Sequence, residues 1–242
     1  MHDAGVIDLP LACRPPVGPA GRRFATAAML CCLAGESAGQ EDEPTPFFRP
    51  AQFQTLCGGE CRATLFAGQF LDSNLTDVLL PFDEDFTPPW RWKTAEDYIV
   101  AGALSRRLAT IGGVFDIEAE IGLAQRFGEE AVSEGWVALF GRWTAFPWND
   151  HVRTSIAVST GLNYASKASA LERAHSATGE SSRLLHYLSP ELTLASPDWD
   201  STEIVLRFHH RSGGGKIWGE TALFGNVAEG AQYWTLGLRH RF

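Results

Sequence analysis

The stretch IVLRFHHRSGGG, residues 204–215, places two histidines and a serine at the end of an apolar, β-branched run. An imidazole can act as a general base and a serine hydroxyl as a nucleophile, so a neighbouring pair can carry out acyl transfer. Two imidazoles can also bind a metal ion. A third interpretation is that these groups are only the polar end of a strand. The face that each side chain occupies separates the three.

Alternation along this run assigns the faces. In a strand, successive side chains point to opposite sides. One face then carries Ile204, Leu206, Phe208, His210 and Ser212, and the other carries Val205, Arg207, His209 and Arg211. His209 and His210 therefore point apart, and we expect no shared metal ion. His210 and Ser212 lie side by side.

The composition limits the class of protein. The chain has 242 residues and a formal net charge of -9 at pH 7. A nucleic-acid binder needs clustered Lys and Arg for phosphate contacts, and this charge argues against one. No apolar run approaches the length of about 18 residues that a membrane helix requires. A transmembrane barrel remains compatible, because only alternate residues of its strands meet lipid.

A period of two recurs along the chain. In residues 115–127, Asp116, Glu118 and Glu120 share one face while apolar residues occupy the other. A helix would scatter these carboxylates. The same alternation predicts strands at 62–70, 97–108, 134–146, 153–165, 183–195, 202–212 and 232–242. Pro190 lies inside one of them and indicates either a weaker strand or a bulge.

The connections and the C-terminus predict the fold. Long and short connections alternate, with GEEAVS interpreted as a loop of medium length, as expected for long outer loops and short periplasmic turns. The chain ends in TLGLRHRF, which resembles the signal that the barrel-assembly machinery recognises, with Phe242 as the terminal aromatic residue. We therefore predict an all-β protein, an eight-stranded antiparallel transmembrane β-barrel of the outer-membrane type, located in the bacterial outer membrane.

The N-terminal region differs from the rest. Within residues 1–40, Arg22 and Arg23 precede an apolar stretch and small residues, which is the pattern of a secretory signal. Residues 41–61 are expected to form a leader, and residues 62–242 the barrel. In an exported chain, Cys57 and Cys61 are expected to close a small disulfide loop.

This topology predicts how deep His210 and Ser212 lie in the membrane. Two arginines and a histidine suit a polar lumen, so His210 and Ser212 face the bilayer. The strand 202–212 runs outward and ends at Ser212, which places the pair at the depth of the outer leaflet, where lipopolysaccharide is found. Within the lumen, the three carboxylates are expected to pair with arginines, from the set Arg106, Arg142, Arg207 and Arg239.

An eight-stranded barrel with a lipid-facing His-x-Ser near the outer end of a late strand resembles the lipid A 3-O-deacylase (PagL-type) family. The resemblance rests on His210 and Ser212, and HHRSG, RWTAFPW and LGLRHRF also look like uncharacterised outer-membrane proteins grouped with it. It implies an ester hydrolase with a Ser–His–Glu triad, no metal or other cofactor, and lipid A as substrate. The implied acid is Glu229, with Glu220 as the alternative.

The sequence departs from that family after the serine. The family usually has Asn there as a contributor to the oxyanion hole, and this chain has Gly213. The backbone N–H groups of Gly213 and Gly214 can still stabilise an oxyanion. Two other functions stay open: a non-catalytic barrel that stabilises the envelope or docks lipopolysaccharide, and a small-solute porin.

Overall fold

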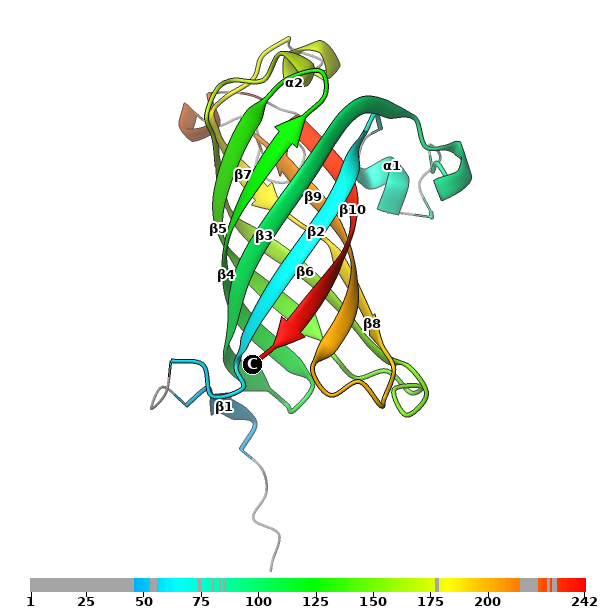
Figure 1. Cartoon of the computed structure of the whole chain (residues 1–242), viewed down its shortest axis with the longest axis vertical. Coiled ribbons are helices and arrows are strands. Elements are labelled where there is room, and N and C mark those ends of the chain that lie inside the picture. The colour runs from blue at the N-terminus through cyan, green and yellow to red at the C-terminus, as the bar shows by residue number, and fades with distance from the viewer. Residues whose placement is uncertain are drawn as a thin grey trace, which may run out of the picture. The chain divides into compact units, whose positions relative to one another are not determined.

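A closed antiparallel barrel forms the body of the protein (Figure 1). The structure, a computed structural model, describes residues 46–52, 56–73, 75–79, 81–82, 84, 86–176, 179–213, 222–225, 227 and 230–242. In this part of the chain the wall has eight strand paths: β2 (Cys61–Leu71), β3 (Thr94–Ile111), β4 (Phe115–Phe127), β5 (Val132–Trp143), β6 (Arg153–Ala165), β7 (Leu184–Leu188) continued by β8 (Glu191–Ala195), β9 (Thr202–Ser212) and β10 (Gly230–Arg241). The pairing of β2 with β10 closes the ring, which confirms the predicted fold.

Short segments flank the wall. Strand β1 (Phe48–Pro50) pairs with the end of β3. The remaining elements are α1 (Leu75–Leu79), η2 (Pro89–Arg91), α2 (Ala170–His175) and η3 (Ala222–Phe224). No helix among the described residues is long and apolar enough to cross a bilayer.

The connections differ between the two ends of the barrel. One end carries the turns 112–114, 144–152 and 196–201, and the other carries the connections 72–93, 128–131, 166–183 and 213–229. Short turns face the periplasm in outer-membrane barrels, so we refer to these as the periplasmic and outer ends. The β4–β5 connection is a tight hairpin and not the loop of medium length that the sequence predicted, because β5 begins at Val132, two residues earlier than expected.

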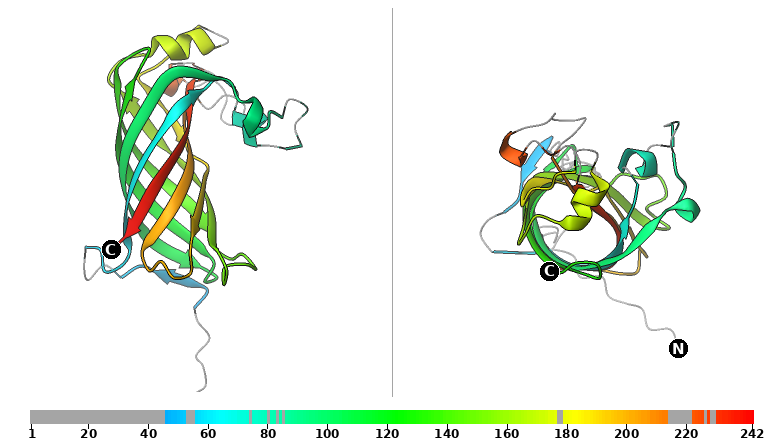
Figure 2. Two further views of the ribbon diagram at one scale, coloured as in Figure 1. Left: turned by 45° about the vertical axis from the view of Figure 1, so that its right-hand side comes forward. Right: turned by 90° about the horizontal axis from the view of Figure 1, so that it is seen from above.

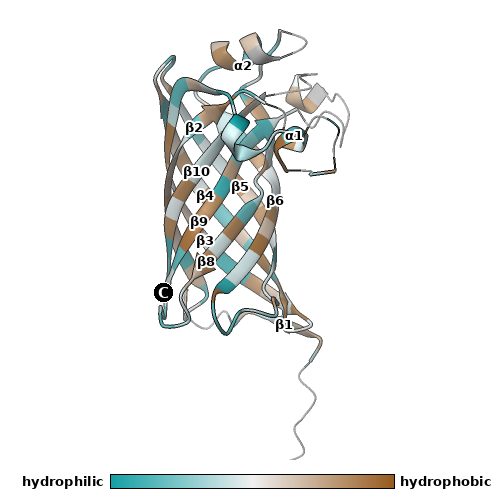
Figure 3. Ribbon diagram, turned by 90° about the vertical axis from the view of Figure 1, so that its right-hand side faces the viewer, coloured by the Kyte–Doolittle hydropathy of each residue, from teal (hydrophilic) through white to brown (hydrophobic). Residues whose placement is uncertain are grey.

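An apolar belt surrounds the barrel. Figure 3 shows hydrophobic and hydrophilic positions alternating along the strands. The exposed members of the belt include Leu65, Val100, Leu104, Ile121, Leu123, Val137, Leu139, Ile156, Val158, Ile204, Leu236 and Leu238. Closure leaves no unpaired sheet edge in the wall, and such closed barrels are the β-structures that can span a bilayer. The belt and the closure together are those of an outer-membrane barrel.

Ion pairs fill the lumen, as the alternating carboxylates predicted. Arg142 Nε donates to Glu118 Oε1 at 2.8 Å, and the guanidinium of Arg207 makes two 2.8 Å bonds to Glu120. Glu191 adds a third carboxylate, which accepts from Arg142, Arg207 and Arg239. Each of these arginines forms an ion pair with at least one buried carboxylate. Side chains therefore fill the interior, as expected for an eight-stranded barrel.

One arginine was assigned to the lumen wrongly. Arg106 follows exposed Leu104 on the outward face of β3, whereas Arg107 follows buried Ser105 on the luminal face and is paired with Glu118 of β4. Arg107 consequently lies 3.8 Å from Asp116, whereas Arg106 donates to the carbonyl of Gln52 at the periplasmic end. Alternation along this strand therefore assigns Arg107, and not Arg106, to the lumen, and the register shift before Ala109 comes after both arginines.

Pro190 interrupts the sixth wall strand, as its position suggested. Between β7 and β8, hydrogen bonds of Ser189 connect the chain to both neighbouring strands. Ser189 N–H donates to Ser159 Oγ of β6, and Ser189 Oγ donates to the carbonyl of Phe208 of β9. The carbonyl of Pro190 accepts from the N–H of Phe208 at 2.9 Å. The strand therefore keeps its contact with β9 although proline supplies no N–H.

A helix covers the outer opening of the barrel. Seen from above in Figure 2, α2 lies across the opening. Ser169 caps the helix by accepting from the N–H of Glu172. The carboxylate of Glu172 is buried and contacts Arg126 at 2.9 Å and Arg211 at 3.2 Å, and Leu171 packs into the interior cluster. The loop 166–183 thus closes the lumen.

The predicted disulfide between Cys57 and Cys61 is present at the start of β2. The expected signal segment, residues 1–40, lies outside the described residues, as does the first part of the expected leader. The wall begins at Cys61, one residue before the predicted boundary.

Candidate functional site

His210 and Ser212 occupy the outer face of β9, near its outer end, as predicted. Side chains of this strand that lie on the other face, such as Arg207 and His209, are buried in the lumen. The next strands supply one polar neighbour each. His186 of β7 is paired with Ser212 in the register, and Gln232 of β10 is paired with His210.

His186 is a further member of the candidate site, and the sequence analysis did not identify it. It lies between Leu184 and Leu188 on the outward face of β7, and its Nε2 is 2.9 Å from Thr160 Oγ1 of β6. The available signal was a single histidine on an otherwise apolar outward face. Only the strand register shows that it is opposite Ser212.

The strand register also shows which of His186 and His210 lies nearer to Ser212. Residues directly opposite on antiparallel strands have Cβ atoms about 4.5–5.5 Å apart. Positions two apart along one strand are separated by about 7 Å. The backbone of His186 is consequently nearer to Ser212 than that of His210, and Ser212 has an imidazole on each side.

Ser212 and its neighbour Gln232 are shielded from the surroundings of the barrel. Ser212 is 9% exposed and Gln232 is 4% exposed. The ring of Phe224 in η3 lies 6.3 Å from the ring of His186. The Nδ1 atom of His210 is buried and has no hydrogen-bond partner among the described residues. A buried imidazole nitrogen without a partner is costly, which makes it a candidate for contact with a ligand or substrate.

Gly213 follows the serine for a steric reason. A Cβ atom at this position would lie 1.4 Å from the backbone oxygen of Val227. A side chain such as Asn is therefore incompatible with this arrangement of the β9–β10 connection. The other implied members of the site, Gly214, Glu220 and Glu229, lie outside the described residues. The residue opposite His210 is Gln232, which cannot act as an acidic partner.

An apolar groove of about 850 Å³ on the barrel surface reaches β7 beside the site. Its lining includes a row of paired residues that crosses the strands: Leu65, Gly102, Leu123, Gly135, Tyr164 and Leu184. The glycines remove side-chain volume between the larger residues. Leu184 is two residues from His186 on the same face of β7.

His209 has a structural environment in the lumen. Its Nε2 is 2.8 Å from Glu134 Oε2, and its Nδ1 is 3.2 Å from the hydroxyl of Tyr187. The prediction that His209 and His210 point to opposite faces is confirmed. Among the described residues, no three His, Cys, Asp or Glu side chains group as metal ligands.

No protein-family model matches the chain, and no curated protein sequence matches it. Solved structures share its barrel architecture at low identity. Neisserial surface protein A is 9% identical, covers 76% of this chain and 97% of its own, and gives a TM-score of 0.42. A de novo designed transmembrane β-barrel is 6% identical, with 76% and 96% covered and a TM-score of 0.38. The attachment invasion locus protein of Yersinia pestis, solved with the heparin analogue sucrose octasulfate, is 13% identical, with 76% and 98% covered and a TM-score of 0.34.

Proposed function

We propose that the protein is an outer-membrane ester hydrolase that removes an ester-linked acyl chain from lipid A in the outer leaflet. The observation that supports this most is the position of Ser212, which is next to His210 on its own strand and opposite His186 on β7, all on the outer face. Polar side chains on a lipid-facing surface are costly, and a cluster of them suggests a function.

In this proposal, Ser212 is the nucleophile and His210 its general base. The imidazole accepts the hydroxyl proton as Oγ attacks the ester carbonyl. The tetrahedral oxyanion accepts hydrogen bonds from the backbone N–H groups of Gly213 and Gly214. The sugar oxygen leaves with the proton from the imidazolium, and water then hydrolyses the acyl–serine ester to release the fatty acid. Glu229, or else Glu220, holds the imidazole.

The apolar groove supports a membrane lipid as the substrate. It belongs to the lipid-facing surface and its lining reaches Leu184, next to His186. An acyl chain in this groove stays in an apolar environment while its ester reaches Ser212. A substrate of the outer leaflet then arrives by lateral diffusion and does not enter the filled lumen.

A second function is favoured by two different observations. Gln232, and not an acid, is opposite His210, and Ser212 is only 9% exposed. These features suit a non-catalytic barrel that docks lipopolysaccharide or stabilises the envelope. In that case the histidines bind lipid headgroups and Ser212 has no chemical role.

Fatty-acid release from purified lipopolysaccharide tests the two functions. The full chain, folded in detergent or vesicles, is compared with Ser212→Ala, and Ser133→Ala, a change on the exposed side of β5, is the matched control. Hydrolysis by the unmodified protein and the control, but not by Ser212→Ala, supports the enzyme. Absence of released fatty acid with all three proteins, each shown to be folded by its gel mobility, contradicts it.

A further inference from the structure

The connection 72–93, which we call the side loop, folds over the outside of the barrel. Its helix α1 contributes buried Val78, which clusters with Phe208, an outward residue of β9. Trp92 meets the ring of Phe208 edge-on at 5.6 Å between centroids, and its Nε1 donates to the carbonyl of Thr87. Trp234 of β10 joins this cluster. The side loop therefore occupies a part of the wall that lipid covers elsewhere.

The other side of the side loop exposes large aromatic residues. Trp90 is 83% exposed and Phe82 is 95% exposed. Trp92 packs onto Phe208 of the barrel, whereas Trp90 in η2 is left largely exposed. Trp side chains are enriched at the boundary between headgroups and acyl chains, because the ring is amphipathic. In Figure 2 the side loop projects laterally from the outer end of the barrel.

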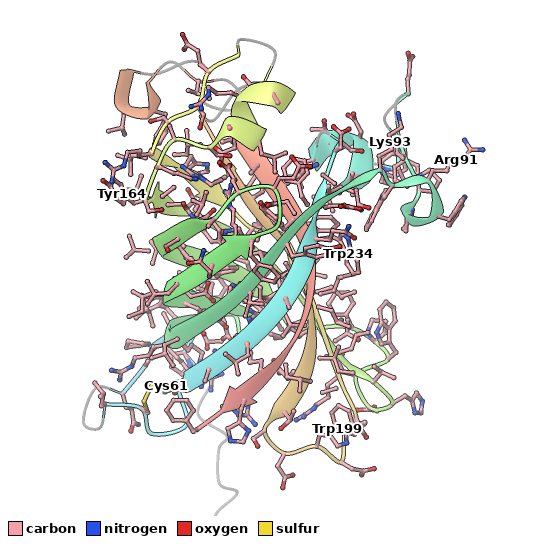
Figure 4. The ribbon with its side chains drawn as sticks, turned by 45° about the horizontal axis from the view of Figure 1, so that its top comes forward. Cys61, Arg91, Lys93, Tyr164, Trp199 and Trp234 are labelled. Atoms are coloured by element: carbon pink, nitrogen blue, oxygen red, sulfur yellow. A yellow bond between two sulfur atoms is a disulfide. The ribbon has the colours of Figure 1, made fainter. Side chains whose placement is uncertain are left out.

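Two cations accompany Trp90. Arg91 and Lys93 are exposed, and neither has a salt bridge to another described residue. The luminal arginines, in contrast, are paired with carboxylates. In Figure 4, Arg91 lies at the outer edge of the side loop, and Trp234 lies on the barrel wall. The side loop also has five acidic residues in its sequence, Asp72, Asp77, Asp83, Glu84 and Asp85, so its positive charge is confined to the segment around Trp90.

We propose that the side loop is a lipid-docking surface, on which Arg91 and Lys93 bind phosphate groups of outer-leaflet lipids while Trp90 enters the boundary between headgroups and acyl chains. Guanidinium and ammonium groups form charge-assisted hydrogen bonds to phosphate. The continuity of the side loop with the apolar belt selects lipid as the partner. This surface is independent of any chemistry at Ser212.

Fluorescence quenching in vesicles tests the proposal. The full chain, with Cys13, Cys31 and Cys32 replaced by Ser, carries a polarity-sensitive fluorophore at Trp90→Cys, and the Cys57–Cys61 disulfide is kept oxidised. Leu236→Cys in the apolar belt is the lipid-exposed reference, and Glu129→Cys in the β4–β5 hairpin is the solvent-exposed reference. We expect quenching at position 90 by phospholipids with a nitroxide near the headgroup, and protection there from aqueous iodide. Iodide quenching equal to that at position 129, without quenching by nitroxide lipids, overturns the proposal.

A comparison of anionic and zwitterionic lipids tests whether Arg91 and Lys93 bind phosphate. Nitroxide-labelled phosphatidylglycerol is expected to quench the label at position 90 more strongly than nitroxide-labelled phosphatidylcholine. Arg91→Ala combined with Lys93→Ala should make the two lipids equal, whereas Arg173→Ala, which removes an exposed cation on α2, should leave the difference in place. Equal quenching by both lipids in the unmodified side loop contradicts phosphate binding. A preference that survives the double substitution contradicts the assignment to these residues.

Discussion

Ser212 on β9 and His186 on β7 are directly opposite each other on the outer face of the barrel. His210 is two residues from Ser212 on the same strand. The serine therefore has the imidazoles of both His186 and His210 as neighbours. The two histidines differ in their contacts, since His186 Nε2 is hydrogen-bonded to Thr160 whereas the buried Nδ1 of His210 has no partner among the described residues.

This difference predicts unequal effects on hydrolysis. His210→Ala should lower the rate of lipid A deacylation by about 10³-fold or more, as expected for the loss of a general base. His186→Ala should lower it by about tenfold or less, because His186 positions the serine without accepting its proton. Fatty-acid release from lipopolysaccharide measures both rates. If His186→Ala abolishes release and His210→Ala does not, His186 is the base and our assignment is wrong.

The adjacent histidine on the luminal face should affect stability. His209→Ala removes the partner of Glu134 Oε2 and leaves a buried carboxylate with fewer hydrogen bonds. We expect the free energy of unfolding to fall by about 2–4 kcal/mol. Urea unfolding followed by Trp fluorescence measures this loss. His210→Ala is the matched control and should change stability by less than about 1 kcal/mol. An equal loss in both variants would contradict the assignment of the two faces.

The filled lumen predicts that the barrel does not conduct ions. Arg207 joins Glu120 to Glu191 across the interior, and Glu172 of α2 closes the outer opening. Planar-bilayer recordings of the full chain should therefore show no stable channel. Ion channels of reproducible conductance would support the small-solute porin instead.

The attachment of α2 to the β4–β5 hairpin should depend on pH. Burial opposes ionisation of Glu130, but hydrogen bonds from the Ser169 hydroxyl and the backbone N–H of Ala170 outweigh it, so the pKa of Glu130 lies below its ordinary value. A lowered pKa in the folded state stabilises this contact above the unfolded pKa, and the stabilisation is lost as the pH falls through the folded pKa. The contact should thus persist at pH 6 and weaken below the ordinary glutamate pKa, about 4.3.

Hydrogen exchange measures this attachment. Amide protection of α2 at pH 6 should exceed that at pH 3, after correction for the intrinsic exchange rate. Glu130→Gln should remove this pH dependence, whereas Glu129→Gln, an exposed neighbour, should retain it. The same pH dependence in Glu130→Gln would rule out Glu130 as its source.

Sequence alternation predicted the wall because each strand has one apolar and one polar face. The carboxylates Glu118 and Glu120 could be assigned to the lumen for the same reason, and both are paired there with arginines. Features that depend on backbone register were not predictable in this way. The shift in the β3–β4 register between Arg107 and Ala109 is one such feature.

The candidate site was predicted only along β9. His210 and Ser212 follow from alternation within one strand, whereas His186 and Gln232 come from strands whose register the sequence does not give. The steric need for Gly213 was also hidden, because it depends on the path of the backbone at Val227. Pairing between strands, and not residue type, decides which polar groups meet at this site.

The mass of lipid A from cells shows directly whether the protein removes an acyl chain. Cells that produce the unmodified chain, Ser212→Ala or no chain are compared by mass spectrometry, with equal amounts of folded barrel verified in the outer membrane. We predict that only the unmodified chain yields lipid A lighter by one ester-linked acyl group. Identical lipid A in all three cells, or the same loss of mass with Ser212→Ala, would contradict it.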